Sequence, residues 1–330
     1  MPLAFDVAAI GNAIVDVIAP CSDAFLAEQG LDKGTMHLID AERSASLYAA
    51  MAQAVEASGG SAGNTVAGVA SFGGKAAYIG KVANDQLGEV FTHDIRAQGV
   101  HFETPPLEGA EATARSMINV TPDGQRTMAT FLGVAGLLTR DDVDPDVIQG
   151  AAITYLEGYL FDPPPAREAF EKAAGIAKGA GRKVSITLSD VFVVERWREP
   201  LLDFLSHSTD LVFANQNELL ALFQTDDFDE ALNRVRGLVP MAAVTRSELG
   251  SIVVSGGKAW EVPACPVDKV VDTTGAGDQY AAGFLFGLAH GRSPDDCARL
   301  GALAAAEVIA HYGPRPMVSL RELAEKEGLL

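Results

Sequence analysis

Residues 271–291 read VDTTGAGDQYAAGFLFGLAHG, and this stretch decides which fold and chemistry the chain is expected to have. Gly275 and Gly277 allow backbone N–H groups to converge in a tight turn, and the apolar run that follows predicts a buried helix beginning near Asp278. A turn of this kind at a helix N-terminus binds anions. Asp278 then has two interpretations: it caps the helix, or it accepts a proton beside a bound phosphate.

The rest of the chain alternates between short apolar runs and helix-forming segments. Expected strands are FDVAAI (5–10), AAYIGKV (76–82), AAITYLEGY (151–159), KVSITLS (183–189), DLVFA (210–214), MAAVT (241–245) and SIVV (251–254). Expected helices cover residues 41–57, 62–72, 86–98, 164–179 and 194–206. Strands separated by helices of this length imply right-handed crossovers and a mostly parallel sheet covered on both faces. The sequence therefore predicts an α/β, doubly wound fold.

Two stretches, 15–40 and 101–131, do not follow that alternation. The second contains ARSMINVTPDGQRTMATF, which predicts two strands joined by a turn at residues 122–124. Both stretches leave the core where parallel strands end, which is where open α/β sheets bind ligands. We therefore expect them to form a small antiparallel β lid over the active site, with residues 1–14, 41–100 and 132–330 forming the core.

Composition excludes several classes of function. The chain has 330 residues, of which 25 are Lys or Arg and 44 are Asp or Glu, so a net charge of −19 argues against affinity for nucleic acid or an anionic membrane. Its three cysteines are widely spaced and show no zinc pattern. No apolar run is long enough to span a bilayer and the N-terminus has no basic leader, so we expect a cytoplasmic protein.

The turn and its helix resemble the signature of the ribokinase-like (PfkB) family of sugar and nucleoside kinases. Four other segments resemble further marks of that family and occur in the same order: GNAIVD (11–16), GGSAGN (59–64), NQNE (215–218) and TRSELG (245–250). The resemblance covers nearly the whole chain. It implies transfer of a phosphoryl group from ATP to a hydroxymethyl group, with Asp278 as the base and the turn Gly275-Ala276-Gly277 holding the transferred phosphate.

The resemblance also assigns residues to the acceptor. Asp16, Gly60 and Asn64 are expected to hold its hydroxyl groups. Asn12, Ile14 and Ser61 lie beside them in the same loops. Further apolar positions are expected to line the pocket beyond the sugar: Met36, Leu38, Met117, Phe131 and Leu132.

The nucleotide is expected to lie on the other side of the signature turn. Asn215 and Glu218 correspond to the family's magnesium and phosphate environment, where Glu218 would act on Mg²⁺ through water. The expected ATP contacts are Thr245, Arg246, Gly250, Thr273, Gly275 and Gly277. Arg126, at the lid turn, is either a surface arginine or a cation that meets the γ-phosphate when the lid closes. A K⁺ site near residues 311–315 is left open.

An apolar slot suits a flat purine base better than a free sugar, which needs hydrogen-bond partners on all sides. The loops at 11–16 and 59–64 also look closer to adenosine kinases than to ribokinases. We therefore expect adenosine as the acceptor, with ribose, fructose or ketodeoxygluconate as alternatives, in a monomer or homodimer whose partners are small molecules.

Other motifs fit less well. The chain has no GxxxxGK[ST] loop and no GxGxxG after its first strand. Residues 59–63 match the GxSxG elbow of serine hydrolases, with Ser61 as nucleophile, but an elbow requires a preceding strand and residues 41–57 predict a helix. A non-catalytic sugar-binding or regulatory protein on the same fold is the remaining alternative.

Overall fold

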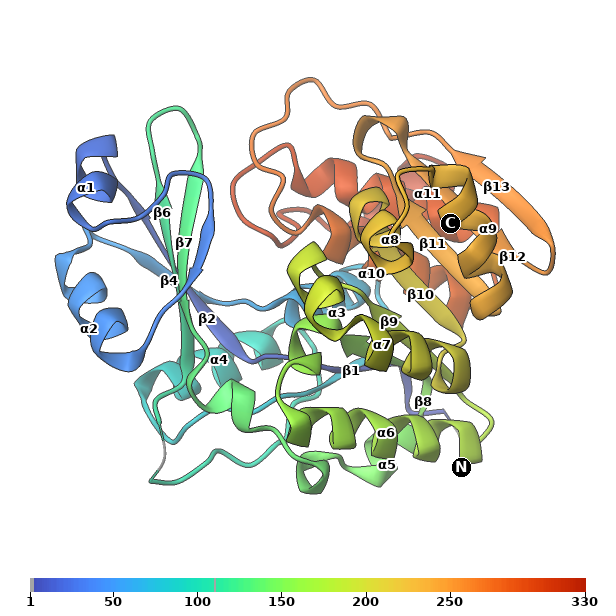
Figure 1. Ribbon diagram of the computed structural model, residues 1–330, viewed down its shortest axis with the longest axis horizontal. Coiled ribbons are helices and arrows are strands. Elements are labelled where there is room, and N and C mark those ends of the chain that lie inside the picture. Colours follow the sequence, from blue (N-terminus) through green and yellow to red (C-terminus); the bar gives the residue numbers. More distant parts are fainter. Residues whose placement is uncertain (1–2, 110) are drawn as a thin grey trace.

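The computed structural model describes residues 3–109 and 111–330 and has a large and a small part, each built on its own sheet (Figure 1). Within these residues the large sheet has eight strands in the order β13-β12-β11-β10-β9-β8-β1-β5. Their bounds are β1 Phe5–Ile10, β5 Ala76–Ile79, β8 Ala151–Glu157, β9 Lys183–Thr187, β10 Leu211–Asn215, β11 Met241–Thr245, β12 Ser251–Ser255 and β13 Lys258–Val262. All pairings from β5 to β11 are parallel, and β12 and β13 add antiparallel strands at one edge. The predicted α/β fold is confirmed.

Helices cover both faces of the large sheet. They are α3 Ser61–Ser71, α4 Gln86–Ala97, α5 Pro145–Gln149, α6 Pro164–Gly179, α7 Val191–Ser208, α8 Gln216–Phe223, α9 Phe228–Leu238, α10 Ala276–Ala289, α11 Pro294–Val308 and α12 Leu320–Lys326. Short 3₁₀ helices lie at Gly133–Leu137, Arg140–Asp142, Gly158–Phe161 and Ser247–Leu249. Side chains alternate along β1: Ala8 and Ile10 join the core with α6 to α9, whereas Val7 and Ala9 join the core with α3 and α10.

Helix α10 is the structural centre of the second core. Nine consecutive residues from Gln279 to Gly287 are buried, because α3 lies on one side of the helix and α11 on the other. A Cβ at Gly283 would stand 2.4 Å from the backbone oxygen of Leu300, so only glycine permits this close approach of α10 and α11. The apolar run after the signature turn is therefore explained by burial on all sides.

The small sheet has the order β3-β7-β6-β2-β4. Its strands are β2 Ile14–Pro20, β3 Met36–Leu38, β4 Val55–Ser58, β6 Ala114–Val120 and β7 Arg126–Phe131, and the helices α1 Asp23–Glu28 and α2 Ala41–Ala50 lie on its outer side (Figure 1). Strands β6 and β7 form the predicted antiparallel hairpin, and β2 pairs with β4 in the same sense. The pairs β2–β6 and β3–β7 are parallel, so the sheet is mixed.

The helix expected over residues 41–57 ends at Ala50 instead. Residues 55–58 form strand β4, where Val15 pairs with Ser58 and Ile18 with Val55. Here the hydrogen-bonding edge of β2 overrides a local preference for helix. Residues 41–58 therefore pack with the small sheet, although we had assigned them to the core. That the small part acts as a lid stays a prediction.

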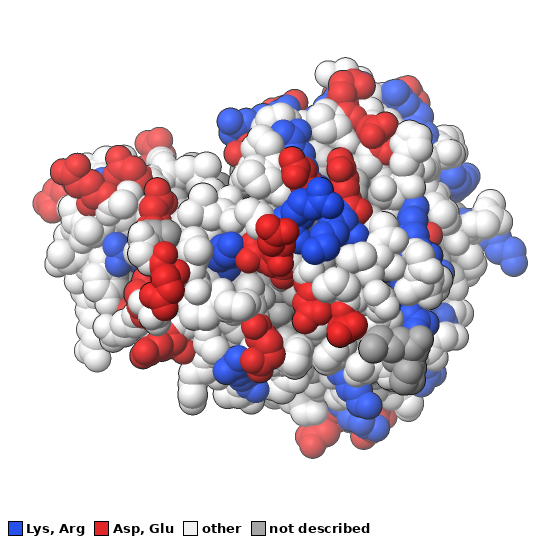
Figure 2. Space-filling model, turned by 90° about the horizontal axis from the view of Figure 1, so that it is seen from below, with Lys and Arg blue, Asp and Glu red and all other residues white. Residues whose placement is uncertain are grey.

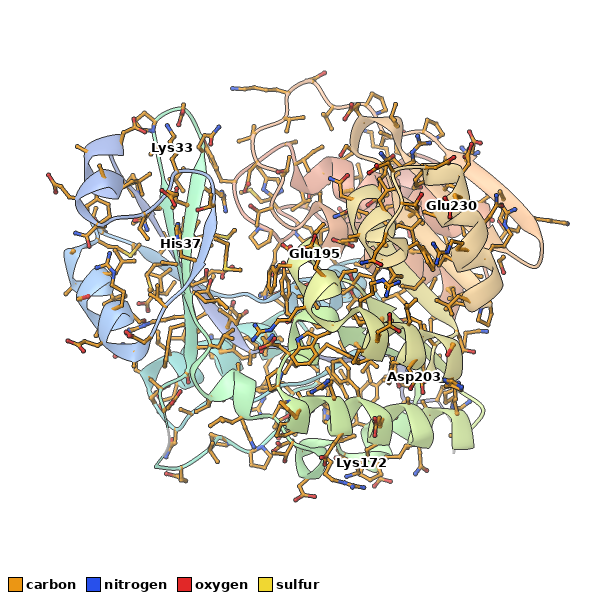
Figure 3. The ribbon with its side chains drawn as sticks, in the orientation of Figure 1. Lys33, His37, Lys172, Glu195, Asp203 and Glu230 are labelled. Atoms are coloured by element: carbon orange, nitrogen blue, oxygen red, sulfur yellow. The ribbon has the colours of Figure 1, made fainter. Side chains whose placement is uncertain are left out.

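Charged side chains are spread over the face that Figure 2 shows. On the side seen in Figure 2, acidic side chains lie over both parts of the molecule and the basic ones form separate groups between them. Lys33, at the far end of the small part (Figure 3), donates to Asp23 of α1 and to Asp123 of the β6–β7 turn, each at 2.7 Å. Among the described helices, none has the length and apolar character needed to cross a lipid bilayer.

Candidate active site

A cleft of about 410 Å³ lies where the small sheet meets the strand ends of the large one. The small sheet contributes Ile14, Asp16, Met36 and Leu38, and the large part contributes Asn12, Leu132, Gly60 and the α3 residues Ser61 and Asn64. The side on which the nucleotide is expected contributes Asn215, Glu218, Thr245, Thr273 and the turn Gly275, Ala276, Gly277 and Asp278. Most residues that the sequence assigned to the site thus line a single cleft.

The signature turn depends on Gly275. Its φ of +79° is left-handed, and a Cβ there would stand 2.6 Å from the backbone oxygen of Pro314, so no other residue fits. Asp272 fixes the preceding residues, because its Oδ1 accepts from the backbone N–H of Thr274 at 3.1 Å and from its hydroxyl at 2.8 Å. Helix α10 then begins at Ala276, slightly earlier than predicted, and its N-terminus lies on the cleft.

Asp278 does not cap this helix. The cap position is Gly275, and the Asp278 carboxylate faces α3 instead: Oδ1 accepts from the hydroxyl of Ser61 at 2.6 Å and Oδ2 from the side-chain amide of Asn64 at 3.0 Å. Burial raises the pKa of Asp278, and the two hydrogen bonds and the cation of Arg315 oppose that rise. A carboxylate with a raised pKa, held in a cleft beside a helix N-terminus, is equipped to accept a proton.

Asp16 lies on β2 and closes the acceptor end of the cleft. A Cβ on Gly59 would stand 2.4 Å from its carboxylate, and Gly60 has a φ of +82° at a point where a Cβ would stand 2.3 Å from the backbone oxygen of Asn12. The two glycines are thus required for the close packing of the loop on β2 and on residue 12. Burial raises the pKa of Asp16 to about 6, although Arg315 and Arg126 lower it.

Glu157 belongs to this site and was missed by sequence reasoning. It ends β8, and it accepts from the backbone N–H of Asn12 at 3.3 Å, from the side-chain amide of Asn12 at 2.8 Å and from the backbone N–H of Ala62 at 2.9 Å. Burial raises its pKa to about 7. One signal was present: a single acid ends the otherwise uncharged buried strand AAITYLE.

Asn215 and Glu218 form a capping box at the start of α8. The amide group of Asn215 donates to Glu218 Oε1 at 2.6 Å, its backbone N–H donates to Oε2 at 2.9 Å, and the backbone N–H of Glu218 donates back to Asn215 Oδ1 at 2.8 Å. The NxxE spacing therefore has a structural explanation. Glu218 nevertheless lines the cleft, and burial raises its pKa to about 7.

Arg246 and Gly250 do not line the cleft, in contrast to Thr245. The guanidinium of Arg246 lies over the ring of Phe228 at 4.5 Å and donates to Gln216 at 3.1 Å. Gly250 has a φ of +84° and packs against Val262, where a Cβ would stand 2.1 Å from the backbone oxygen. These features show a structural role for both residues.

Arg126 is neither exposed nor free at the lid turn. Its guanidinium stands 2.5 Å from Asp272 Oδ2 and lies over the ring of Tyr312 at 5.8 Å, and its side chain is only 6% exposed. The β6–β7 hairpin is thereby joined to the segment just before the signature turn. A contact of Arg126 with the γ-phosphate stays a prediction.

Met117 and Phe131 point away from the cleft, so their predicted place in its lining is wrong. Side chains alternate along each strand, and on β6 and β7 it is the neighbouring Ser116, Ile118 and Thr130 that face the cleft. Met117 is fully buried in the core beneath the small sheet. A one-residue error in which face a strand presents explains both misplacements.

Four aromatic residues that line the cleft were not anticipated: Tyr159, Phe192, Phe213 and Tyr280. Tyr159 follows β8 and Phe192 lies in the first turn of α7, and their ring centroids are 6.0 Å apart with an angle of 35° between the planes. Together with Met128 of β7 they extend the apolar side of the cleft. Aromatic residues are common in buried cores, so no sequence signal distinguished the aromatic residues of the cleft from those of the core.

The structure removes one argument against the hydrolase interpretation and adds another argument against it. Strand β4 does precede Ser61, contrary to the predicted helix, but the Ser61 hydroxyl donates to Asp278 and no histidine is among the described residues that line the cleft. The triad of serine hydrolases places a histidine between the serine and the carboxylate, and the direct bond from Ser61 to Asp278 leaves no such intermediary among the described cleft residues.

Comparison with known proteins agrees with this geometry. The model of the pfkB family carbohydrate kinases matches residues 31–320. The chain belongs to that family. Adenosine kinase from Sinorhizobium meliloti is 57% identical with a TM-score of 0.92, covering 98% of this chain and 99% of that one. A probable sugar kinase from Rhizobium etli CFN 42 is 55% identical with a TM-score of 0.94, covering 99% and 100%.

More distant relatives extend the same family. Adenosine kinase from Saccharomyces cerevisiae is 27% identical over 327 residues, which cover 92% of this chain and 95% of the yeast protein. Family membership makes this chain a phosphotransferase that uses ATP and acts on a hydroxyl group of a small molecule. Which hydroxyl-bearing molecule it phosphorylates depends on the cleft.

Proposed function

We propose that this kinase phosphorylates the 5′-hydroxymethyl group of adenosine, producing AMP and ADP. The observation that carries the proposal is that a single cleft combines polar and apolar lining. Asp16, Asn64 and Asp278 belong to its polar part, as a ribose requires, while aromatic and aliphatic side chains form its apolar part.

The apolar part of the cleft lining suits the flat purine base of a nucleoside. Tyr159 and Phe192 offer ring faces, and the small sheet adds Met36, Ile118 and Met128. Burying an aromatic face against such groups contributes on the order of one to a few kcal/mol. A free sugar would leave this part in contact with water and would find few hydrogen-bond partners there, so a nucleoside uses the cleft better.

In the proposed reaction, Asp16 and Asn64 hold the ribose hydroxyls so that the 5′-oxygen faces Asp278. The carboxylate accepts the hydroxyl proton as the oxygen attacks the γ-phosphorus of ATP, and ADP leaves. Backbone N–H groups at the start of α10, from Gly275 to Gly277, stabilise the negative charge on the transferred group. Most of the rate enhancement comes from holding the two reactants in line.

Magnesium is proposed on the nucleotide side. Within residues 3–109 and 111–330, no three His, Cys, Asp or Glu side chains gather closely enough to hold a metal by themselves. Mg²⁺ keeps several waters and binds through one or two carboxylates together with substrate phosphates, so the Glu218 carboxylate that lines the cleft suits this ion. Glu218 would hold it through water, and the ion would supply charge neutralisation for the phosphates.

One experiment tests both the proposed nucleoside substrate and the alternative of a free sugar. Adenosine, guanosine, inosine, ribose, fructose and ketodeoxygluconate are each supplied with ATP and Mg²⁺, and ADP release and the phosphorylated product are measured. We expect adenosine to have the highest kcat/KM. A sugar kinase is the second candidate, because Glu157 adds polarity to the acceptor end, and a higher kcat/KM for any free sugar would replace our proposal with it.

Binding of an acceptor without ADP release would favour a regulatory role. The Asp278→Asn variant is the control in every reaction, since its residual ADP release measures hydrolysis or contamination.

A further inference from the structure

Arg315 lies behind the catalytic carboxylates at the centre of a hydrogen-bond network. It follows the segment that packs on the signature turn, and its side chain is only 14% exposed. Its Nε donates to Asn64 Oδ1 at 3.2 Å, and one terminal nitrogen donates to the hydroxyl of Ser58 at 2.5 Å and lies 3.4 Å from Asp94 Oδ2. Arg315 does not line the cleft, so it acts through the residues it contacts.

The bond to Asn64 decides which way that side-chain amide faces. An asparagine side chain can present either its oxygen or its NH₂ group to a neighbour. Because Arg315 donates to the oxygen, the NH₂ group is directed at Asp278, to which it donates at 3.0 Å. Without Arg315, only the contact with Asp278 would hold the amide in this orientation, and the amide would be free to turn away from the carboxylate.

The guanidinium is also the cation nearest to a group of acids. Asp94 on α4 pairs with it directly, and its charge lowers the pKa of Asp16 and of Asp278, which burial otherwise raises. Glu157 also interacts with Asp278 and adds negative charge. An arginine stays protonated in such surroundings, so the positive charge is permanent.

Arg315 further joins the two parts of the molecule. Ser58 ends strand β4 of the small sheet, and its backbone N–H donates to Asp94 Oδ2 at 2.8 Å. A single side chain therefore contacts the small sheet, helix α4 and the residue that orients Asp278.

We propose that Arg315 is a positioning residue for phosphoryl transfer: it directs the amide of Asn64 at Asp278 and holds the carboxylates of Asp16 and Asp278 in their ionised form. The proposal rests on the proposed function only in taking Asp278 as the base. An ion pair that merely stabilises the fold would give none of the catalytic effects described next.

The test compares Arg315→Met with Arg315→Lys, and with Arg299→Met as a matched control. Arg299 forms a surface pair with Asp295 on α11 and does not line the cleft, so its variant should behave as wild type. For Arg315→Met we expect kcat to fall by roughly 10- to 100-fold, with a smaller change in the KM for ATP. The acidic limb of the pH profile of kcat/KM should move to higher pH. Arg315→Lys should return the acidic limb to its wild-type position, because lysine retains the positive charge, and it should recover only part of kcat.

A second measurement does not depend on the acceptor. Protein carrying ¹³C at the aspartate carboxyl groups is titrated by NMR, and the Asp278 signal is identified by its absence in Asp278→Asn. We expect this signal to titrate at higher pH in Arg315→Met than in wild type. If that variant does not fold, Arg315→Gln replaces it, since it retains a donor for Ser58 and Asp94.

Two results would overturn the proposal. One is a folded neutral variant whose Asp278 signal titrates as in wild type, and the other is a kcat and acidic limb that match those of Arg299→Met. If adenosine proves not to be an acceptor, the proposed function fails while the NMR titration still decides the role of Arg315.

Discussion

Replacing Asp278 with Asn tests the assignment of the base with little change of shape. The amide oxygen of the new side chain can accept from Asn64, and its NH₂ group can donate to the hydroxyl of Ser61, so both contacts of the carboxylate have a substitute. What is lost is the ability to take a proton. General-base catalysis contributes about 10²- to 10⁴-fold, so we expect kcat to fall roughly 10³-fold, equivalent to about 4 kcal/mol in the activation barrier.

Binding and stability should respond differently from turnover. Nucleoside affinity, measured by calorimetry, should stay within about threefold of wild type, because each tenfold change requires about 1.4 kcal/mol of lost contacts. Since burial raises the pKa of Asp278, the ionised carboxylate is disfavoured there, and the neutral amide should melt at the same or a higher temperature at pH 8.

The assay is ADP release coupled to a dehydrogenase, with Asp203→Asn as the matched control. Asp203 lies on α7 with 77% of its side chain exposed (Figure 3), so its variant should retain full activity. Turnover of Asp278→Asn within tenfold of wild type would refute the role of this carboxylate as the base.

Three further changes probe the turn, the slot and the buried acid. Gly275→Ala should lower the free energy of unfolding by more than about 1 kcal/mol because its Cβ would meet Pro314, and an unchanged urea midpoint would contradict this. Tyr159→Leu should raise the KM for adenosine roughly tenfold and leave the KM for ATP unchanged in initial-rate assays. A KM for adenosine equal to that of wild type would show that this ring does not contact the base. The pKa of Glu157 is raised to about 7 in the folded state from 4.5, so wild type should lose stability as pH rises between these values. Glu157→Gln should remove the part of that loss that Glu157 causes, on the order of 1–3 kcal/mol, while Asp16 and Glu218, whose pKa values are also raised, keep their parts. Parallel stability–pH curves of variant and wild type would show the pKa of Glu157 to be unshifted.

The chemistry near Gly275 could be predicted from sequence because it is local. A glycine required by a left-handed turn, a helix that follows it and an acid three residues later all lie within one short segment. Asp16 and Asn64 were placed in the same cleft through the family resemblance, which carries long-range information that the segments do not contain by themselves.

The predictions that were wrong or missing concern residues whose structural contacts lie far away in the sequence. Which face a strand presents is set by its register in the sheet, so Met117 and Phe131 were assigned to the cleft in place of their neighbours. The bond from Arg315 to Asn64 joins residues 251 positions apart. No pattern within either segment indicates such a contact.

The two carboxylates of the site stand on separate bodies, with Asp16 in a strand of the small sheet and Asp278 at the start of a helix packed into the large one. We expect a tilt of one body against the other to change the distance between these two carboxylates, so that binding of the acceptor at Asp16 would also align its reacting hydroxyl group with Asp278. An acceptor analogue without the hydroxyl groups that Asp16 is proposed to hold is therefore expected to leave the cleft open to solvent, and hydrolysis of ATP without phosphoryl transfer should rise.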